Sequence, residues 1–412
     1  MDTVASNGIG GMIRKTFYSL RTRNFRLYFT GQLISNTGNW LTNVALILFV
    51  LKITGSGLAV GLLAACQYGP ILFLSAYGGA IADRFDKRKM LLISQSLEMA
   101  QSVSLAVLAF MPHPSLVWLY ALAILGGVFL AFDNPFRRSF VGEMVPSEDI
   151  PNAVVLYSTI VNVSRIFGPA LAGLLATTLG FGWCFTIDAA SYIAVIVGIM
   201  MMRPAELFRR PRRPRAENKG EVREGIRYIL SMPLLWISFV LLAAIGTLAY
   251  NFSVTLPLFV TDTLHSSGEV FTILYSTFSL GAVACALVVA HRSLVKMRHI
   301  LLGAATLGVT MLLLAFSSSV WVAAIAVFLV GVGSILYMTS TTTIVQVEAK
   351  PEMHGRVLAL QMVFIAGTSV IGGPLSGWLA DALGGRAPLV LGGVVCLLAA
   401  TFGYYASRRY IK

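Results

Sequence analysis

Charged residues are scarce in this sequence. Asp, Glu, Lys and Arg make up only 12% of the 412 residues, hydrophobic residues make up 57%, and the mean hydropathy is +0.78. An ordinary soluble domain carries about 25% charged residues. The composition therefore excludes a soluble globular protein and predicts a protein that crosses the membrane several times.

The motifs of enzymes and metal sites are missing too. The four cysteines are dispersed through apolar runs, with neither a CxxC pair nor a zinc spacing, which is typical of small core residues. The sequence has no phosphate-binding GxxxxGK[ST] loop and no nucleophile elbow before a helix. We therefore expect no enzyme activity, no metal site and no cofactor.

Long apolar runs are what the sequence has in abundance. Twelve of them are long enough to span a bilayer, roughly at 26–51, 58–82, 90–111, 115–136, 150–178, 182–202, 232–261, 269–290, 299–317, 319–346, 357–383 and 387–407. They predict an all-α membrane protein with twelve transmembrane helices. The N-terminal stretch carries no separate apolar region before a cleavage site, so we expect no signal peptide.

Basic residues indicate the orientation. The formal net charge is +13, and with a cytoplasmic N-terminus every Lys and Arg except Lys52, Arg165 and Arg386 falls in a cytoplasmic segment. This is the bias that orients membrane proteins. We expect both termini in the cytoplasm and the protein in a bacterial-type cytoplasmic (plasma) membrane. Anionic lipid of the inner leaflet, rather than nucleic acid, is the expected partner of this charge.

The two halves of the sequence repeat each other. Pro146 and Gly168-Pro169 recur as Pro351 and Gly373-Pro374 about half the chain later. The basic segment 204–229 lies between the halves and predicts a cytoplasmic linker with a surface helix at Glu221–Leu230. We expect two pseudo-symmetric six-helix bundles, 1–203 and 230–412, with a substrate site between them.

A charged hinge joins the second and third spans. Its sequence is Gly79-Ala-Ile-Ala-Asp83-Arg84-Phe-Asp86-Lys87-Arg88-Lys89. In order and spacing it resembles the loop between helices 2 and 3 of the major facilitator superfamily. Asp86 stands where the usual second glycine would be, a variant similar to the branch of drug:proton antiporters that contains macrolide-efflux proteins and the enterobactin exporter.

This resemblance implies the major facilitator fold and a conformational role for Gly79, Asp83, Arg84, Lys87 and Arg88. Asp83 would cap the N-terminus of helix 11 and hold the halves together when the cytoplasmic side is shut. An ordinary solvated turn is the alternative.

The fifth span carries a second motif. Its stretch Arg165-Ile-Phe-Gly168-Pro169-Ala-Leu-Ala-Gly173, in which Ser164 replaces the family's first glycine, resembles the antiporter motif of facilitator exporters. Small residues allow membrane helices to approach closely, and proline bends a helix. Generic helix packing is the alternative to an exporter motif. We assign helix packing to Gly168, Pro169, Gly173, Gly373, Pro374 and Gly377.

Three carboxylates lie within spans, and such groups are costly and usually functional. Asp133 lies about 5 Å from the inner face, level with the hinge. The family resemblance implies that an acid on helix 4 interacts with the hinge arginine and takes part in proton coupling. Asp133 is thus the first coupling candidate, with a static partner of Arg84 or Arg137 as the alternative. Glu98, with no basic residue expected at its depth, is the second.

Arg165 and the third acid, Asp188, lie at matching depths on sequential helices. Both are about 10 Å from the outer face, counting about 1.5 Å per residue. We therefore predict that they form a structural ion pair. The alternative is that Arg165 faces the cavity and binds an anionic substrate.

Polar and aromatic residues on three spans predict a cavity lining. They are Gln32, Asn39, Asn43, Tyr250, Asn251, Tyr337, Thr341 and Gln346. Few fixed charges and many apolar groups favour a bulky amphipathic substrate.

We therefore predict a secondary active transporter, a monomer that exports drug-like or siderophore-like small molecules in exchange for protons by alternating access, as multidrug-resistance antiporters do. An importer or symporter of a metabolite, and a non-transporting membrane sensor or scaffold, are the alternatives.

Overall fold

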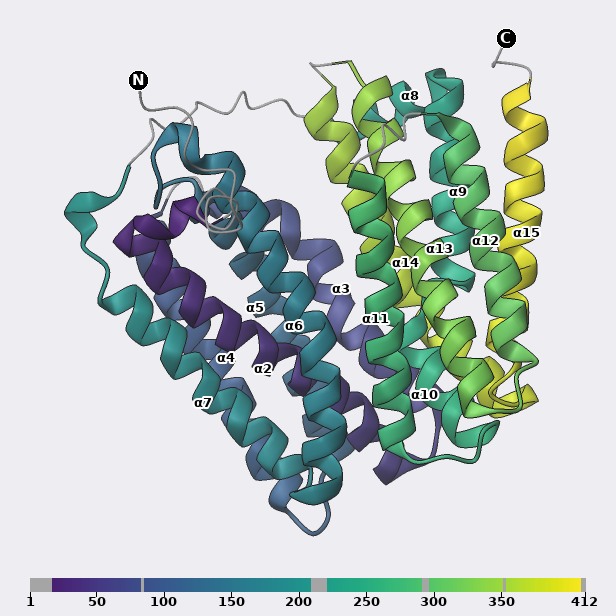
Figure 1. Cartoon of the computed structure of the whole chain (residues 1–412), viewed down its shortest axis with the longest axis horizontal. Helices are drawn as coiled ribbons and strands as arrows, with labels where there is room; N and C mark the ends of the chain where they lie inside the picture. Colours follow the sequence, from purple (N-terminus) through teal and green to yellow (C-terminus); the bar gives the residue numbers. More distant parts are fainter. Residues whose placement is uncertain (1–16, 83–84, 209–220, 291–295, 351–352, 409–412) are drawn as a thin grey trace, which may run out of the picture.

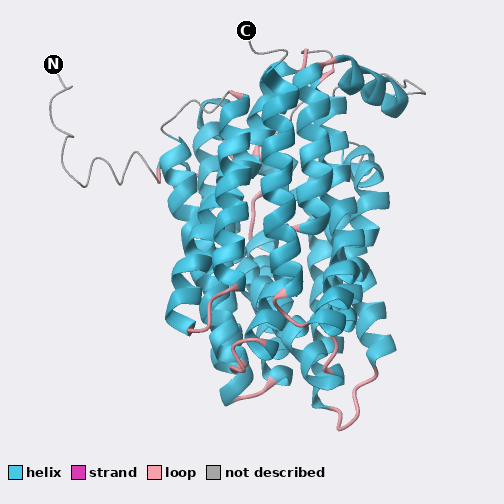
Figure 2. Cartoon of the chain, turned by 90° about the vertical axis from the view of Figure 1, so that its right-hand side faces the viewer, coloured by secondary structure: helices cyan, strands magenta, loops and turns pink. Residues whose placement is uncertain are grey.

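The computed structural model describes residues 17–82, 85–208, 221–290, 296–350 and 353–408 (Figure 1). These residues contain twelve helical spans long and apolar enough to cross a membrane, and none of them forms a strand (Figure 2). Helices satisfy every backbone hydrogen bond within one segment, which lipid demands. The predicted all-α fold with twelve spans is confirmed.

The first half contains six spans, α2 (Arg23–Thr54), α3 (Gly57–Ala82), α4 (Lys87–Phe110), α5 (Leu116–Val141), α6 (Ile150–Thr178) and α7 (Phe181–Met200). Short 3-10 turns lie before α2, before α6 and after α7, namely η1 (Tyr18–Arg21), η2 (Ser147–Asp149) and η3 (Pro204–Glu206). The second half contains α9 (Pro233–Leu248), α10 (Phe252–Asp262), α11 (Gly268–Ala290), α12 (Met297–Ala315), α13 (Val320–Glu348), α14 (His354–Leu383) and α15 (Ala387–Arg408).

The seventh span is broken, which the sequence did not indicate. One continuous apolar run was predicted, but α9 ends at Leu248 and α10 begins at Phe252. At the break, Asn251 donates a hydrogen bond from Nδ2 to the carbonyl oxygen of Thr247 at 2.8 Å. The side chain therefore satisfies a carbonyl group at the end of α9, whose last carbonyls have no partner within the helix.

A surface helix, α8 (Glu221–Ser231), precedes the second half. It packs against α9 and α14, and Glu224 pairs with Arg356 of α14 at 2.8 Å. Its position matches the predicted surface helix, whereas the linker residues 209–220 lie outside the described residues.

The two halves repeat the same helix pairings. In the first half α2 packs against α6 and α7, α3 against α5, and α4 against α5 and α7. In the second half α9 packs against α14 and α15, α11 against α13, and α12 against α13 and α15. This is the pseudo-symmetry of two six-helix bundles that the sequence repeat predicts.

Glycines bring the halves together along α3 and α14. A Cβ atom at Gly377 would overlap the carbonyl oxygen of Gly57, and one at Gly61 would overlap that of Gly373. The same spacing of four residues on both helices lets the two backbones touch. Likewise, α6 approaches α11 at Gly173, where a Cβ would overlap the hydroxyl of Thr272.

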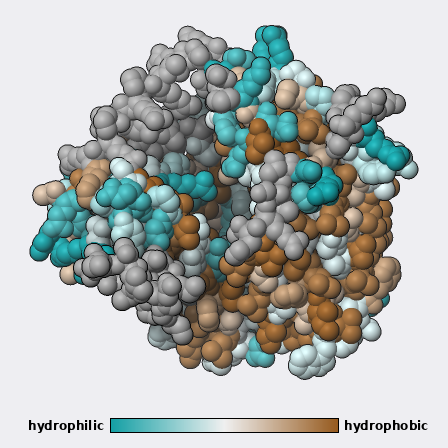
Figure 3. Space-filling view, turned by 45° about the horizontal axis from the view of Figure 1, so that its top comes forward, coloured by the Kyte–Doolittle hydropathy of each residue, from teal (hydrophilic) through white to brown (hydrophobic). Residues whose placement is uncertain are grey.

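One end of the molecule is closed and the other is open. At the end where α3 begins and α14 ends, Asp381 accepts hydrogen bonds from the backbone nitrogens of Gly57 at 2.6 Å and Leu58 at 2.9 Å, and from Ser56 Oγ at 2.8 Å. We call this the closed end. At the opposite end, where α2 begins and α15 ends, the halves diverge (Figure 1), and a hollow lies between them (Figure 3). We call this the open end.

Candidate functional site

A cavity of about 270 Å³ lies between the halves, and most of its wall belongs to the first half. Among the described residues of the second half, Ser253 and Tyr275 contribute to this wall. The polar and charged lining residues of the first half include Asn36, Asn39, Asn43, Gln67, Glu98, Gln101, Asn134, Arg137 and Asp188. Aromatic residues, among them Trp40, Tyr68 and Tyr192, complete the wall, so the cavity suits an amphipathic molecule.

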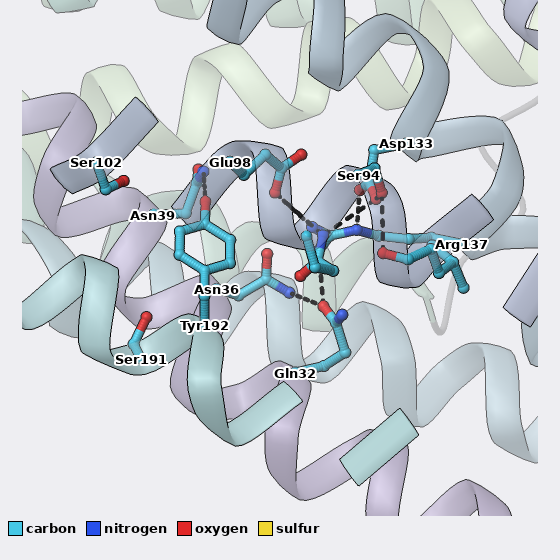
Figure 4. A network of polar contacts seen from close by, with 12 residues as sticks. Gln32, Asn36, Asn39, Ser94, Glu98, Ser102, Asp133, Arg137, Ser191 and Tyr192 are labelled. Atoms are coloured by element: carbon cyan, nitrogen blue, oxygen red, sulfur yellow. Dashed lines mark hydrogen bonds and ion pairs between the residues drawn. The ribbon is translucent and has the colours of Figure 1, made fainter. Parts of the chain in front are cut away.

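Arg137 is the centre of a buried polar cluster (Figure 4). It lies one turn after Asp133 on α5 and pairs with that carboxylate through Nε. Its Nη2 lies 3.3 Å from Glu98 Oε2, and its Nη1 donates to Gln32 Oε1 at 2.6 Å. Both acids and the arginine are less than 10% exposed. One guanidinium therefore serves two carboxylates, as its fork of five N–H donors allows.

The polar face of α4 holds the two carboxylates in place. Asp133 Oδ1 accepts hydrogen bonds from Ser94 Oγ at 2.6 Å and from Gln95 Nε2 at 3.1 Å. Gln95 Nε2 also donates to Glu98 Oε2 at 3.0 Å. Asp133 is fully buried behind Glu98, which lines the cavity.

The expectation that Glu98 lacks a basic neighbour is wrong. We placed the end of the fourth span at residue 136, and α5 continues to Val141. The continuation of this helix beyond residue 136 includes Arg137, which reaches Glu98 on α4.

Asp188 of α7 lies further along the same cavity wall and has hydroxyl partners. Its Oδ2 accepts from Ser102 Oγ at 2.7 Å, and Ser191 Oγ lies 3.5 Å from its Oδ1. Ser102 follows Glu98 by one turn on α4. Gly38 of α2 packs directly against the carboxylate, since a Cβ there would lie 2.5 Å from Asp188 Oδ1. A larger residue at position 38 would displace the acid.

The predicted ion pair between Arg165 and Asp188 is not formed. The Arg165 guanidinium lies over the rings of Trp40 and Phe278, 5.6 Å from each centroid. The prediction used only the depth of the two residues along their helices. It did not include the direction in which each side chain points around its helix axis. Arg165 points from α6 toward α11 of the second half, whereas Asp188 points toward α4 and α2.

The predicted lining residues fall into three groups. Asn39 and Asn43 line the cavity, and Asn39 Nδ2 donates to Tyr192 OH at 3.3 Å. Gln32 is buried as a partner of Arg137. Among the others, Tyr250 and Asn251 form the break between α9 and α10, while Gln346 is exposed near the end of α13.

Tyr337 and Thr341 do not line the cavity as predicted. Both are fully buried inside the second half. Their helix α13 lies directly against α12, where a Cβ at Gly303 would lie 2.5 Å from the Tyr337 backbone nitrogen. Sequence reasoning missed Gln101 and Asn134, which lie in apolar runs on α4 and α5 and do line the cavity.

The described part of the hinge anchors helices of the first half. Lys87 pairs with Glu143 after α5. Arg88 donates to the carbonyl oxygens of Ile199 at 3.1 Å and Met200 at 3.0 Å, and so satisfies the C-terminus of α7. Gly79 lies in α3, while Asp83 and Arg84 lie outside the described residues.

A family model described as a transmembrane secretion effector matches residues 14–410. The chain belongs to this family of the major facilitator superfamily. Its sequence is 24% identical over 398 residues to the staphyloferrin A transporter of Staphylococcus aureus, covering 93% of this chain and 96% of that protein. It is 27% identical over 263 residues to the enterobactin exporter EntS of Shigella boydii, covering 64% of this chain and 62% of the exporter.

Solved transporter structures share the fold. A POT family transporter in complex with 5-aminolevulinic acid superimposes with a TM-score of 0.75 at 13% identity, covering 99% of both chains. A bacterial homologue of the human lysosomal transporter Spinster gives a TM-score of 0.72 at 15% identity, covering 96% of this chain and 97% of that one. This facilitator-family chain is therefore a membrane transporter of small molecules.

Proposed function

We propose that this transporter exports amphipathic, siderophore-like molecules across the cytoplasmic membrane in exchange for protons. The two siderophore-related relatives, which are named as a staphyloferrin A transporter and an enterobactin exporter, support the substrate class. The mixed polar and aromatic wall of the cavity fits such molecules. Among the described residues, the start of α2, the end of α15 and most of the Lys and Arg side chains lie at the open end, and we assign this end to the cytoplasmic side.

The shared arginine of the buried cluster carries the proposal of proton coupling. Arg137 supplies one positive charge to the cluster, whereas Asp133 and Glu98, both of which pair with it, supply two negative charges. Binding of one proton leaves the cluster electrically neutral, the less costly state away from water. Glu98 lines the cavity, and its Oε1 is buried without a hydrogen-bond partner. Glu98 Oε1 is therefore the atom that accepts the proton, while Asp133 stays paired with Arg137.

Conformational change would follow from this charge balance. A protonated Glu98 no longer holds Arg137 from the α4 side, so proton binding favours a different arrangement of α4 and α5. A ligand or proton shifts a conformational equilibrium only by its differential affinity for the two states. If the proton stabilises one state and the substrate stabilises the other, the protein exchanges one for the other across the membrane.

The test is transport by the Glu98→Gln variant in proteoliposomes. With an acidic lumen and protein inserted inside out, the wild type should concentrate enterobactin or staphyloferrin A. Glu98→Gln mimics the permanently protonated acid and should lose this uphill accumulation while keeping counterflow exchange without a gradient. The matched control is Ser96→Ala on the exposed face of α4, which should transport like the wild type.

Two results would contradict the proposal. Uphill accumulation by Glu98→Gln would show that the coupling proton binds elsewhere. Accumulation only in right-side-out vesicles would show import, the alternative direction.

A further inference from the structure

Arg165 occupies the seam between the two halves, midway along α6. Its guanidinium lies between Trp40 of α2 and Phe278 of α11, which belong to different halves. The seam is fixed beside it, because Ser276 Oγ of α11 donates to the carbonyl oxygen of Ile166 at 3.1 Å. The position of the charge is therefore set by both halves.

The arginine has no acidic partner. Among the residues that the structure describes, it enters no ion pair, and its Nε is buried without a hydrogen-bond partner. A cation inside a membrane span is costly unless it is paired or functional. Contacts with the faces of aromatic rings offset part of this cost, but they leave the buried Nε–H group without an acceptor.

The surroundings of Arg165 connect it to the cavity. Trp40, whose ring lies under the guanidinium, also lines the cavity, and Tyr68 and Tyr275 belong to the same cavity wall. On the other side, a second cavity of about 540 Å³ opens among the ends of α2, α6 and α10, with Gly173 and Thr177 of α6 in its wall. Arg165 thus lies next to the wall of the first cavity, in contact with its residue Trp40.

We propose that Arg165, Trp40, Tyr68, Tyr275 and Phe278 form an anion-binding subsite for the transported molecule. The ligand class is an amphipathic anion with a carboxylate or ionised phenol beside a flat ring. The guanidinium stays charged and offers parallel N–H donors to such a group, and the aromatic side chains contact the ring. This inference rests on the proposed export of amphipathic molecules and specifies their charge.

The subsite also couples binding to conformation. Trp40 and Tyr68 belong to the first half, and Tyr275 and Phe278 belong to the second. When the closed end opens, α6 and α11 separate, and the aromatic pair across the guanidinium is divided. The bound anion then loses half of its contacts and is released toward the outside.

The experiment compares two probes that differ only in charge, 2-naphthoate and its neutral amide 2-naphthamide. Binding to purified full-length protein in detergent is measured by equilibrium dialysis. The wild type should prefer 2-naphthoate. Arg165→Gln should weaken naphthoate binding about ten- to hundredfold, as expected for lost hydrogen bonds to a charged group. It should leave naphthamide binding unchanged. Arg386→Gln removes an exposed charge near the closed end and should change neither affinity.

Three outcomes would overturn the subsite. One is unchanged naphthoate binding by Arg165→Gln. Another is an equal loss for both probes, which would mean that the arginine only shapes the aromatic wall. If Arg165→Gln does not fold, Arg165→Lys keeps the positive charge and should still prefer 2-naphthoate. Equal affinities for both probes in that folded variant would contradict the proposal.

The vesicle assay separates this inference from the proposed function. An Arg165-dependent preference for 2-naphthoate in a protein that never accumulates substrate against a gradient would remove proton-coupled export and leave the subsite standing. Uphill accumulation by a wild type that binds both probes equally would remove the subsite alone.

Discussion

At the residue scale, Arg137 is the side chain on which the buried cluster depends. We expect Arg137→Ala to lower stability by about 3–5 kcal/mol, because it leaves Asp133 and Glu98 buried without a cation. The double variant Arg137→Ala with Asp133→Ala should recover part of this loss. Thermal unfolding of the purified proteins measures both effects.

The exposed pair of Arg203 and Glu206 offers a control for that experiment. These side chains lie 2.8 Å apart and are 63% and 43% exposed. Arg203→Ala should change stability by at most about 1 kcal/mol, as is usual for surface pairs. Equal losses for Arg137→Ala and Arg203→Ala would show that the buried cluster does not stabilise the fold.

Sequence reasoning found the important residues of the site more readily than their partners. The carboxylates Glu98, Asp133 and Asp188 are recognisable because acids are rare in apolar runs. Their partners depend on helix rotation and on where a helix ends, and neither is encoded in hydropathy. Arg165 was therefore paired with the wrong residue, and the contact of Arg137 with Glu98 was missed.

At the scale of elements, all twelve spans were predictable because length and hydropathy are local properties of the chain. The break between α9 and α10 was not, because Ala249, Tyr250 and Asn251 are no more polar than stretches of other spans that stay helical. The repeated Gly-Pro motif predicted that helices approach closely. It did not indicate that α3 would be the partner of α14.

The crossing of α3 and α14 gives a prediction about this contact. Gly377→Ala should force the two helices apart, because the new Cβ would overlap the carbonyl oxygen of Gly57. Spin labels at Leu179 and Leu383, exposed residues at the closed end of different halves, should then report longer distances by pulsed electron paramagnetic resonance.

Gly367→Ala on the same helix is the matched control. Its Cβ would meet only Leu72 side-chain atoms at 3.5 Å or more, which is an ordinary contact. The label distances should stay as in the wild type. If both variants behave alike, close backbone approach is not what keeps this end shut.

At the scale of the whole molecule, the contacts of Asp381 hold the two halves together at the closed end. Asp381→Asn should weaken this contact by about 0.3–2 kcal/mol, the usual interaction of a carboxylate with a helix N-terminus. The fraction of molecules in which the closed end has opened should rise roughly two- to thirtyfold. The same spin-label pair measures this population.

Asp86→Asn provides the comparison within one half. Asp86 accepts a hydrogen bond from the Lys89 backbone nitrogen at 3.1 Å and caps α4, so it joins no elements of different halves. Its loss should leave the populations unchanged. A shift as large as that of Asp381→Asn would mean that general destabilisation, rather than the contact between halves, opens the molecule.

The strength of the Asp381 contact can be compared with the membrane voltage. One elementary charge that moves through 100 mV releases about 2.3 kcal/mol, slightly more than the upper end of the range for a carboxylate at a helix N-terminus. Under the proposed exchange for protons, the inward passage of a single proton in an energised membrane would therefore supply enough energy to offset this contact. In a cell whose membrane has lost its voltage, that energy is missing. Under the proposed export, we expect the transporter then to rest with its closed end shut, so that exported molecules do not leak back.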